Sequence, residues 1–281
     1  MTLTFVLVKS IPGDPFQQEQ ALPENIYQAL RSHYGLNDPL AIQYVRYLGQ
    51  LAQLNFGPGV MEIILEGFPT SALLGGAALA IAIPIGVCLG ILASVHQRRW
   101  QDTLIIILSS LGMSVPSFVA ATILQYILGI KLGLLPIAQW GSLSHLIMPA
   151  LSLAALPTAF IARMTRVKMI EEFKQGYVIA ARAKGMREST IIFRHVLRNT
   201  LIPLLSYLGP LTASVFTGSF IIEKIYGIPG LGYWFVTSIG NRDYPLIMGV
   251  TIFYCAFLLA MSFIVDTVSL VLDPRIAARQ R

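Results

Sequence analysis

Long apolar stretches, separated by short polar segments, run along most of the chain. Five of them are long and apolar enough to cross a bilayer of about 30 Å as helices, at residues 70–95, 103–130, 146–162, 201–222 and 246–270. A sixth apolar run, residues 1–11, has about half the length of a span and is interpreted as a partial first transmembrane helix. The pattern predicts an all-α membrane protein, a polytopic bundle of about six transmembrane helices with a truncated first helix.

The composition also indicates a membrane protein and excludes an ordinary soluble enzyme. Hydrophobic residues make up 55% of the 281 residues, charged residues make up 12%, and the mean hydropathy is +0.67. A typical soluble domain has about 25% charged residues, because its surface must be covered with polar groups. Six helices of about 20 residues leave room for loops but not for a fused catalytic domain.

The distribution of Lys and Arg predicts the orientation of the bundle. The segments 96–102, 163–200 and 273–281 hold 14 of these residues, whereas 9–69, 131–145 and 223–245 hold 6. Loops rich in Lys and Arg stay in the cytoplasm, so the first set is expected inside. The carboxyl terminus is then cytoplasmic.

Residues 12–69 are expected to form a small cap outside the membrane, before a membrane core at 70–281. The segment carries six acidic residues against two basic ones and contains two stretches with helical patterns, at 22–35 and 41–54. Two interpretations stay open: the cap packs on the bundle, or it is a docking surface for an external partner.

The chain lacks the usual signatures of metal and nucleotide sites. Its four histidines have no second ligand at metal spacing, and Cys88 and Cys255 lie in apolar stretches as small hydrophobic residues. No G-x-x-x-x-G-K-[ST] segment occurs, and GIPGLG at 227–232 does not have the order of a phosphate-binding loop. We therefore expect no cofactor and no catalytic site; any ATP is hydrolysed by another polypeptide.

One predicted cytoplasmic loop, residues 163–200, is far longer than the 2 to 8 residues that usually connect helices of a bundle. Nine of its residues are Lys or Arg. It divides into a short helix, Tyr177 to Lys184, and a second helix that continues into the next span. Gly185 suits the left-handed conformation that ends a helix, and Ser189 or Thr190 is expected to cap the second one.

Small side chains and unpaired positive charges indicate that this loop meets a partner. Ala180, Ala181 and Ala183 would let a short helix lie in a partner's groove. Arg194 and Arg198 are one turn apart, and their repulsion costs about 0.2 to 0.5 kcal/mol on an isolated helix. Either lipid headgroups, worth about 1 kcal/mol per basic residue, or an acidic patch on a cytoplasmic protein would offset it.

The segment YVIAARAKGMRESTIIFRHVLRNTLIP, residues 177–203, resembles the cytoplasmic coupling loop of permease subunits in bacterial binding-protein-dependent ABC importers. It is most similar to the oligopeptide, dipeptide and nickel branch, in which a residue such as Ile179 replaces the Glu of other branches. Further matches extend over most of the chain, among them PGDPF at 12–16, VPSF at 115–118, IYGIPGLG at 225–232 and NRDYP at 241–245. The short outer segment 131–145 resembles the oligopeptide member most.

The resemblance implies a type I ABC importer permease fold and import of peptides, with oligopeptides as the first candidate. Dipeptides, nickel complexes and glutathione are the alternatives, because similar permeases carry them. It implies four kinds of partner in the bacterial inner membrane and beside it: a homologous second permease subunit, two cytoplasmic subunits that use ATP and Mg, an extracytoplasmic solute-binding protein, and membrane lipid, with no nucleic acid. The residues that it assigns to coupling are Tyr177, Ala180, Ala181, Arg182, Ala183, Lys184, Gly185, Arg194, His195, Arg198, Asn199 and Pro203.

Weaker signals concern the path through the membrane. Pro116 is expected to kink the second span beside Ser117, and such kinks commonly line a path. The outer loop is expected to be structural or to close the outer mouth, through Gly227, Pro229, Gly230 and Gly232.

Asp266 is an intramembrane charge near the inner end of the last span; an arginine partner or water explains it better than a proton relay. The rival functions are an ion-coupled carrier, which would need buried acids at mid-membrane, a membrane enzyme, and a non-transport scaffold.

Overall fold

The computed structural model describes residues 37–52 and 59–272, with five isolated positions nearer the amino terminus. Its regular structure is entirely helical within these residues, which confirms the predicted all-α class. The elements are α3 (Leu40–Ala52), α4 (Val60–Val95), α5 (Trp100–Ser114), α6 (Ser117–Leu124), the π-helix η1 (Gln125–Lys131), α7 (Leu143–Glu172), α8 (Gly176–Ala183), α9 (Glu188–Thr190), the π-helix η2 (Ile191–Val196), α10 (Leu197–Tyr226), α11 (Leu231–Asn241) and α12 (Tyr244–Leu272). The predicted partial helix 1–11 and the helical stretch 22–35 fall almost entirely outside the described residues.

Within the described residues, three helices are long and apolar enough to cross a membrane: α4, α7 and the Tyr244–Val265 part of α12. Two bent pairs raise the number to five if each pair is one span: α5 with α6 and η1, and the two parts of α10 with the turns before it. These five correspond to the five apolar stretches of the sequence.

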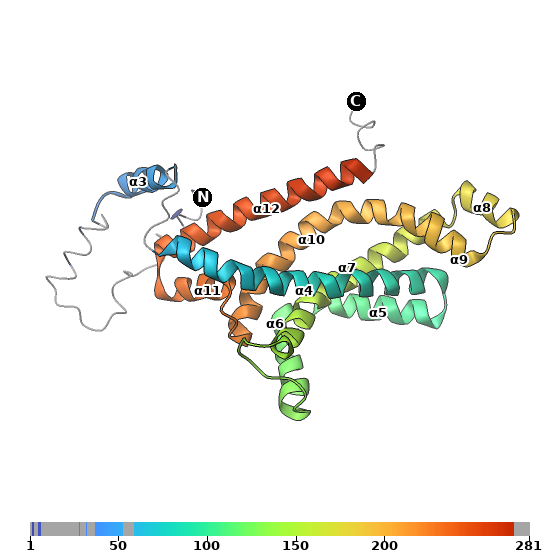
Figure 1. Cartoon of the computed structure of the whole chain (residues 1–281), viewed down its shortest axis with the longest axis horizontal. Helices are drawn as coiled ribbons and strands as arrows, with labels where there is room; N and C mark the ends of the chain where they lie inside the picture. The colour runs from blue at the N-terminus through green and yellow to red at the C-terminus, as the bar shows by residue number, and fades with distance from the viewer. Residues whose placement is uncertain are drawn as a thin grey trace.

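The second predicted span, 103–130, is not one straight helix. The chain bends by 103° between Ser114 and Ser117. Pro116 has no N–H to continue the helical ladder, and Val115 before it has the extended backbone that a following proline imposes, with φ −83° and ψ 118°. The predicted kink at Pro116 is therefore a full break, which directs α6 away from the long helices (Figure 1).

Two predicted span boundaries are wrong because the helices extend beyond the apolar stretches that predicted them. Helix α4 begins at Val60 instead of residue 70, so residues 60–69 belong to the bundle and not to the cap. Helix α7 continues to Glu172, ten residues beyond the end of the predicted span 146–162. Charged side chains end a hydropathy window but do not interrupt backbone hydrogen bonding.

Small residues let α4 and α7 approach closely at the centre of the bundle. Every fourth residue of α4 from Ala78 to Ser94 is small and buried: Ala78, Ala82, Gly86, Gly90 and Ser94. A Cβ on Gly86 would lie 2.8 Å from the Ile161 side chain, and one on Gly90 would lie 2.5 Å from Thr165 Cβ. Such small residues are how membrane helices gain contact without a hydrophobic driving force.

The long helices carry different structures at their two ends. Figure 1 shows α8 and α9 at one end, beside the α4–α5 turn, and α11 at the other. Helix α11 packs on α4, α10 and α12 around a buried cluster that includes Leu231, Leu246 and Val250. Aromatic rings fill this region, with Phe68 against Phe253 at 4.9 Å between centroids.

Candidate functional site

The short helix α8 sits on a small apolar base at the end of the bundle. Its Val178 and Ala181 pack in a buried cluster with Met169 of α7 and with Ile191 and Val196 of η2. Gly185 has φ +73°, the left-handed conformation predicted for it, and reverses the chain after α8. The loop therefore presents one helix on a fixed support.

The outer face of α8 is exposed and partly apolar. Ile179 is 60% exposed, and Ala180, Ala183 and Lys184 are also exposed. Ala181 is only 9% exposed because it faces the apolar base, so a partner that meets this face does not reach it. At a period of 3.6 residues Ala181 points opposite to Ala183, so of the predicted coupling residues it is the one that packs on the chain's own apolar base.

Hydrogen bonds join α8 to both of the long helices beside it. The Tyr177 hydroxyl donates to the Glu172 carboxylate at the end of α7, and Asn199 Nδ2 of α10 donates to Tyr177 Oη at 3.0 Å. Burial and the bond to Glu172 raise the pKa of Tyr177 to about 12, so its hydroxyl keeps its proton at neutral pH. The three side chains form one bridge across α7, α8 and α10.

Arg182 is engaged within the loop, where its guanidinium pairs with Glu188 at 2.7 Å and lies over the Phe173 ring. Arg194 and Arg198 are exposed, and no ion pair among the described residues involves them. His195 is half-buried, and Pro203 lies inside α10, two residues before α10 bends by 50°.

The start of the second loop helix differs from the prediction. Helix α9 begins at Glu188, and no side chain caps it, so neither Ser189 nor Thr190 has the expected role.

A buried ion pair anchors α5 to α7 near the same end. Asp102 accepts two hydrogen bonds from the Arg166 guanidinium, one of them at 2.8 Å from Nη2, and another at 2.9 Å from the Arg98 backbone N–H. Asp102 is 3% exposed. Nothing in the apolar pattern distinguished this carboxylate from its exposed neighbours in the short 96–102 segment.

At the opposite end, Glu223 in the last turn of α10 is completely buried. Its Oε2 accepts a hydrogen bond of 3.1 Å from the backbone N–H of Tyr233, in the first turn of α11. Ser71 of α4 accepts another, at 2.8 Å, from the N–H of Leu231. Side chains from two other helices thus cap the amino end of α11, whose own N-cap residue Gly230 has no side chain to do so.

The glycines of the 227–232 segment provide the space for this arrangement. A Cβ on Gly230 would collide with the Glu223 carboxylate and lie 2.7 Å from Ser71 Oγ; one on Gly232 would lie 2.6 Å from Phe220 Cα. Gly227 ends α10 with φ +64°, and Pro229 is exposed. Of the residues named for the outer mouth, Gly230 and Gly232 therefore form one packed joint with Glu223, which lies one residue beyond the predicted span 201–222, whereas Gly227 and Pro229 are exposed.

Pro116 and Ser117 are not part of that joint. They begin α6, which packs on α7 and α10, whereas α11 packs on α4, α10 and α12. Asp266 lies within α12, but its side chain is outside the described residues.

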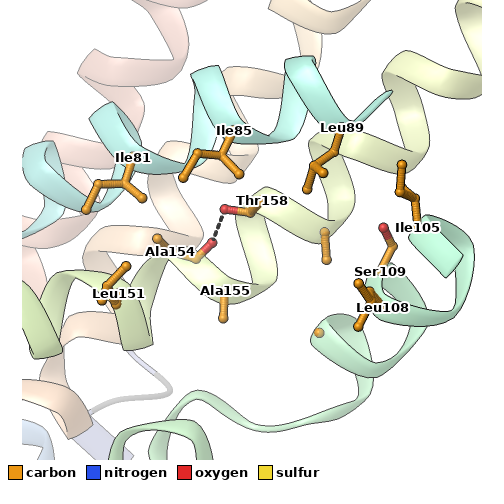
Figure 2. A pocket seen from close by; sticks show the side chains of 12 residues that line it. Ile81, Ile85, Leu89, Ile105, Leu108, Ser109, Leu151, Ala154, Ala155 and Thr158 are labelled. Carbon is orange, nitrogen blue, oxygen red and sulfur yellow. Dashed lines mark hydrogen bonds between the residues drawn. The ribbon is translucent and has the colours of Figure 1, made fainter. Parts of the chain in front are cut away.

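An apolar groove of about 270 Å³ opens between α4, α5 and α7 (Figure 2). Ile81, Ile85 and Leu89 line one side, and Thr158 donates its hydroxyl hydrogen back to the Ala154 carbonyl at 2.8 Å. No charged side chain lines it. The groove thus offers no partner for a charged ligand, and the described residues contain no cluster of His, Cys, Asp or Glu that could hold a metal ion.

A bundle of membrane helices with a short helix held across one end is typical of the membrane subunits of transport systems. Residues 86–278 match the family described as the binding-protein-dependent transport system inner membrane component, and the chain belongs to that family.

Its relatives are similar over nearly their whole length. The dipeptide transport system permease protein DppB of Bacillus subtilis is 43% identical, with 100% of this chain and 93% of the relative covered. The oligopeptide transport system permease protein OppB of Salmonella typhimurium is 40% identical, with 98% and 93% covered.

Solved structures show the same fold. A chain of the MetNI methionine ABC transporter in inward facing conformations has a TM-score of 0.61 and 17% identity, covering 77% of this chain and 99% of that one. A chain of an amino acid ABC transporter has a TM-score of 0.60 and 16% identity, covering 78% and 96%. The predicted type I ABC importer permease fold is confirmed.

Proposed function

We propose that this chain is a permease subunit of an ATP-driven importer that carries peptides across the bacterial cytoplasmic membrane. The exposed face of α8 on its fixed base is the observation that supports coupling to another protein most directly. The similarity to permeases named for dipeptide and oligopeptide transport supports peptides as the substrate class. Oligopeptides are the first candidate, and dipeptides, nickel complexes and glutathione are the alternatives.

Each proposed partner supplies a part of the transporter that this chain does not provide. The sequence contains no Walker-type loop, so two separate cytoplasmic subunits bind ATP and Mg and dock on α8. A homologous second permease completes the path, and a solute-binding protein delivers the peptide from outside. Moving one charge to the bilayer centre costs at least about 2.5 kcal/mol, so charged peptide termini need a polar path that the apolar groove between α4, α5 and α7 does not offer.

Coupling then proceeds through contacts of α8. Closure of the ATPase dimer displaces α8, and its apolar base and the Tyr177 bridge transmit the displacement to α7 and α10. Reversing a 1:99 equilibrium between two conformations takes about 5.5 kcal/mol of differential interaction. ATP binding outside this chain supplies that free energy. Arg194 and Arg198 face lipid headgroups or the ATPase surface at the same end.

The double variant A180W/K184E tests this function. It adds bulk and reverses charge on the exposed face of α8 without touching the apolar base. In proteoliposomes with the partner subunits, we expect peptide-stimulated ATP hydrolysis and ATP-dependent uptake to fall at least about tenfold, which corresponds to a loss of about 1.4 kcal/mol of coupling, with normal membrane insertion.

The matched control is K131E, the same charge reversal on an exposed residue at the end of η1. Normal stimulated ATP turnover in A180W/K184E would contradict the assignment of α8. Uptake abolished by an uncoupler but unaffected by ATP depletion would instead identify an ion-coupled carrier.

A further inference from the structure

Helix α10 carries a hydrogen-bonded joint at each of its ends. Near its beginning, Asn199 binds Tyr177 of α8 at 3.0 Å; in its last turn, Glu223 binds the Tyr233 N–H of α11 at 3.1 Å. Helix α10 runs over the 30 residues from Leu197 to Tyr226, about 45 Å along its path at 1.5 Å per residue, with a bend of 50° between Leu205 and Tyr207. One helix thus connects the coupling loop with α11 at the opposite end (Figure 1).

Among the described side-chain hydrogen bonds, α11 has two attachments to α10 and one to α4. The first attachment to α10 is the bond from the Tyr233 N–H to Glu223 at the amino end of α11. Lys224, next to Glu223 in the last turn of α10, provides a second attachment. Its Nζ donates to Thr237 Oγ1 at 3.0 Å and lies 4.4 Å from the centre of the Tyr233 ring. Ser71 of α4 accepts from the Leu231 N–H and also hydrogen-bonds to Glu223.

This difference predicts which contact breaks when α10 moves relative to α4. Helix α10 holds α11 through both Glu223 and Lys224, so we expect α11 to stay with α10 and the Ser71–Leu231 bond to α4 to separate. Motion of α10 would then displace α11 as well.

We propose that Glu223 is a positioning residue that makes α11 follow α10, and that Ser71 latches α11 to α4 in the conformation described. A displacement of α8 would thereby reach α11 at the far end of the subunit. The inference rests on the proposed coupling of α8 to an ATPase and deepens it. It assigns the movement of α11 to the Glu223 carboxyl group and the release of α11 from α4 to the Ser71 hydroxyl.

The test uses the whole transporter in proteoliposomes, with Cys88 and Cys255 replaced by Ser and a reporter cysteine introduced by N241C. Asn241 is exposed at the end of α11. The rate of labelling by a membrane-impermeant maleimide is measured without nucleotide and after trapping with ATP and vanadate. We expect trapping to change the rate in the reporter background, and E223A to abolish that change.

Two further variants separate positioning from simple structural damage. E223Q keeps an oxygen that accepts from the Tyr233 N–H, so it should retain the nucleotide response. S71A removes the latch, and losing one neutral hydrogen bond should raise the nucleotide-free labelling rate about twofold to tenfold. The matched control S238A removes a buried hydroxyl of α11 that bonds only to the Phe235 carbonyl of the same helix, and should change neither rate.

A full nucleotide response in E223A would overturn the proposal, as would equal loss in E223A and E223Q. Should E223A fail to assemble, S71A decides: a labelling rate equal to that of S238A contradicts the latch. ATP-dependent uptake by the reporter background is measured in parallel. Its absence would refute the proposed function itself, whereas normal uptake with an unaltered E223A response would refute only the role of Glu223.

Discussion

At single positions in this chain, neighbouring side chains decide whether a residue larger than glycine would fit. Gly230, the residue just before α11, lies against the Glu223 carboxylate and Ser71 Oγ, whereas Gly240, near the end of α11, has nothing within 4 Å of the position where a Cβ would stand. The two positions therefore form a matched pair. The GIPGLG segment owes its glycines to this close packing and not to a bound phosphate.

G230A is expected to lower the free energy of unfolding by about 2 kcal/mol, because the new methyl group overpacks the joint and displaces the carboxylate. G240A should change it by less than about 0.5 kcal/mol, as is usual for surface substitutions. Thermal unfolding of the purified subunit in detergent compares the two. Equal stability of both variants would show that the space around Gly230 relaxes freely.

Among the elements, α8 divides its residues between a buried and an exposed face. Ala181 is 9% exposed in the apolar base, and Ala180 beside it is exposed. The sequence shows both as small residues in a predicted helix. Only the packing of Met169, Ile191 and Val196 determines which of the two faces the chain itself.

A181W should disrupt the loop, since the indole cannot fit the base, and overpacking typically costs about 1 to 3 kcal/mol. A180W should leave the loop intact. Limited proteolysis in membrane vesicles distinguishes them: we expect faster cleavage within residues 173–196 for A181W and an unchanged rate for A180W. Faster cleavage of A180W alone would mean that the two faces are assigned the wrong way round.

At the scale of the molecule, the loop that carries α8 and helix α11 occupy opposite ends of the long helices (Figure 1). The predicted orientation places the first in the cytoplasm and the second outside, because the segments at the first end hold most of the Lys and Arg. The orientation itself is a prediction from charge.

Cysteine labelling in intact cells tests it. After Cys88 and Cys255 are replaced, N241C should react with an impermeant maleimide added outside, and K184C should react only after the membrane is permeabilised. Both residues are exposed in the subunit, and the cells express it without the ATPase subunits proposed to cover Lys184, so reactivity depends on the side of the membrane. Labelling of K184C in intact cells would reverse the orientation.

The sequence by itself determined the class of fold, because hydrophobic length and charge bias are enforced by the bilayer and need no tertiary contact. It also located α8, Gly185 and the break at Pro116, whose causes lie within a few residues. The tertiary structure decided what depends on neighbours distant in sequence: the buried side of Ala181, the Asp102–Arg166 pair and the cap that Glu223 and Ser71 place on α11. A hydropathy window treats a carboxylate as a reason to end a span, whereas hydrogen bonds from another helix allow it to be buried there.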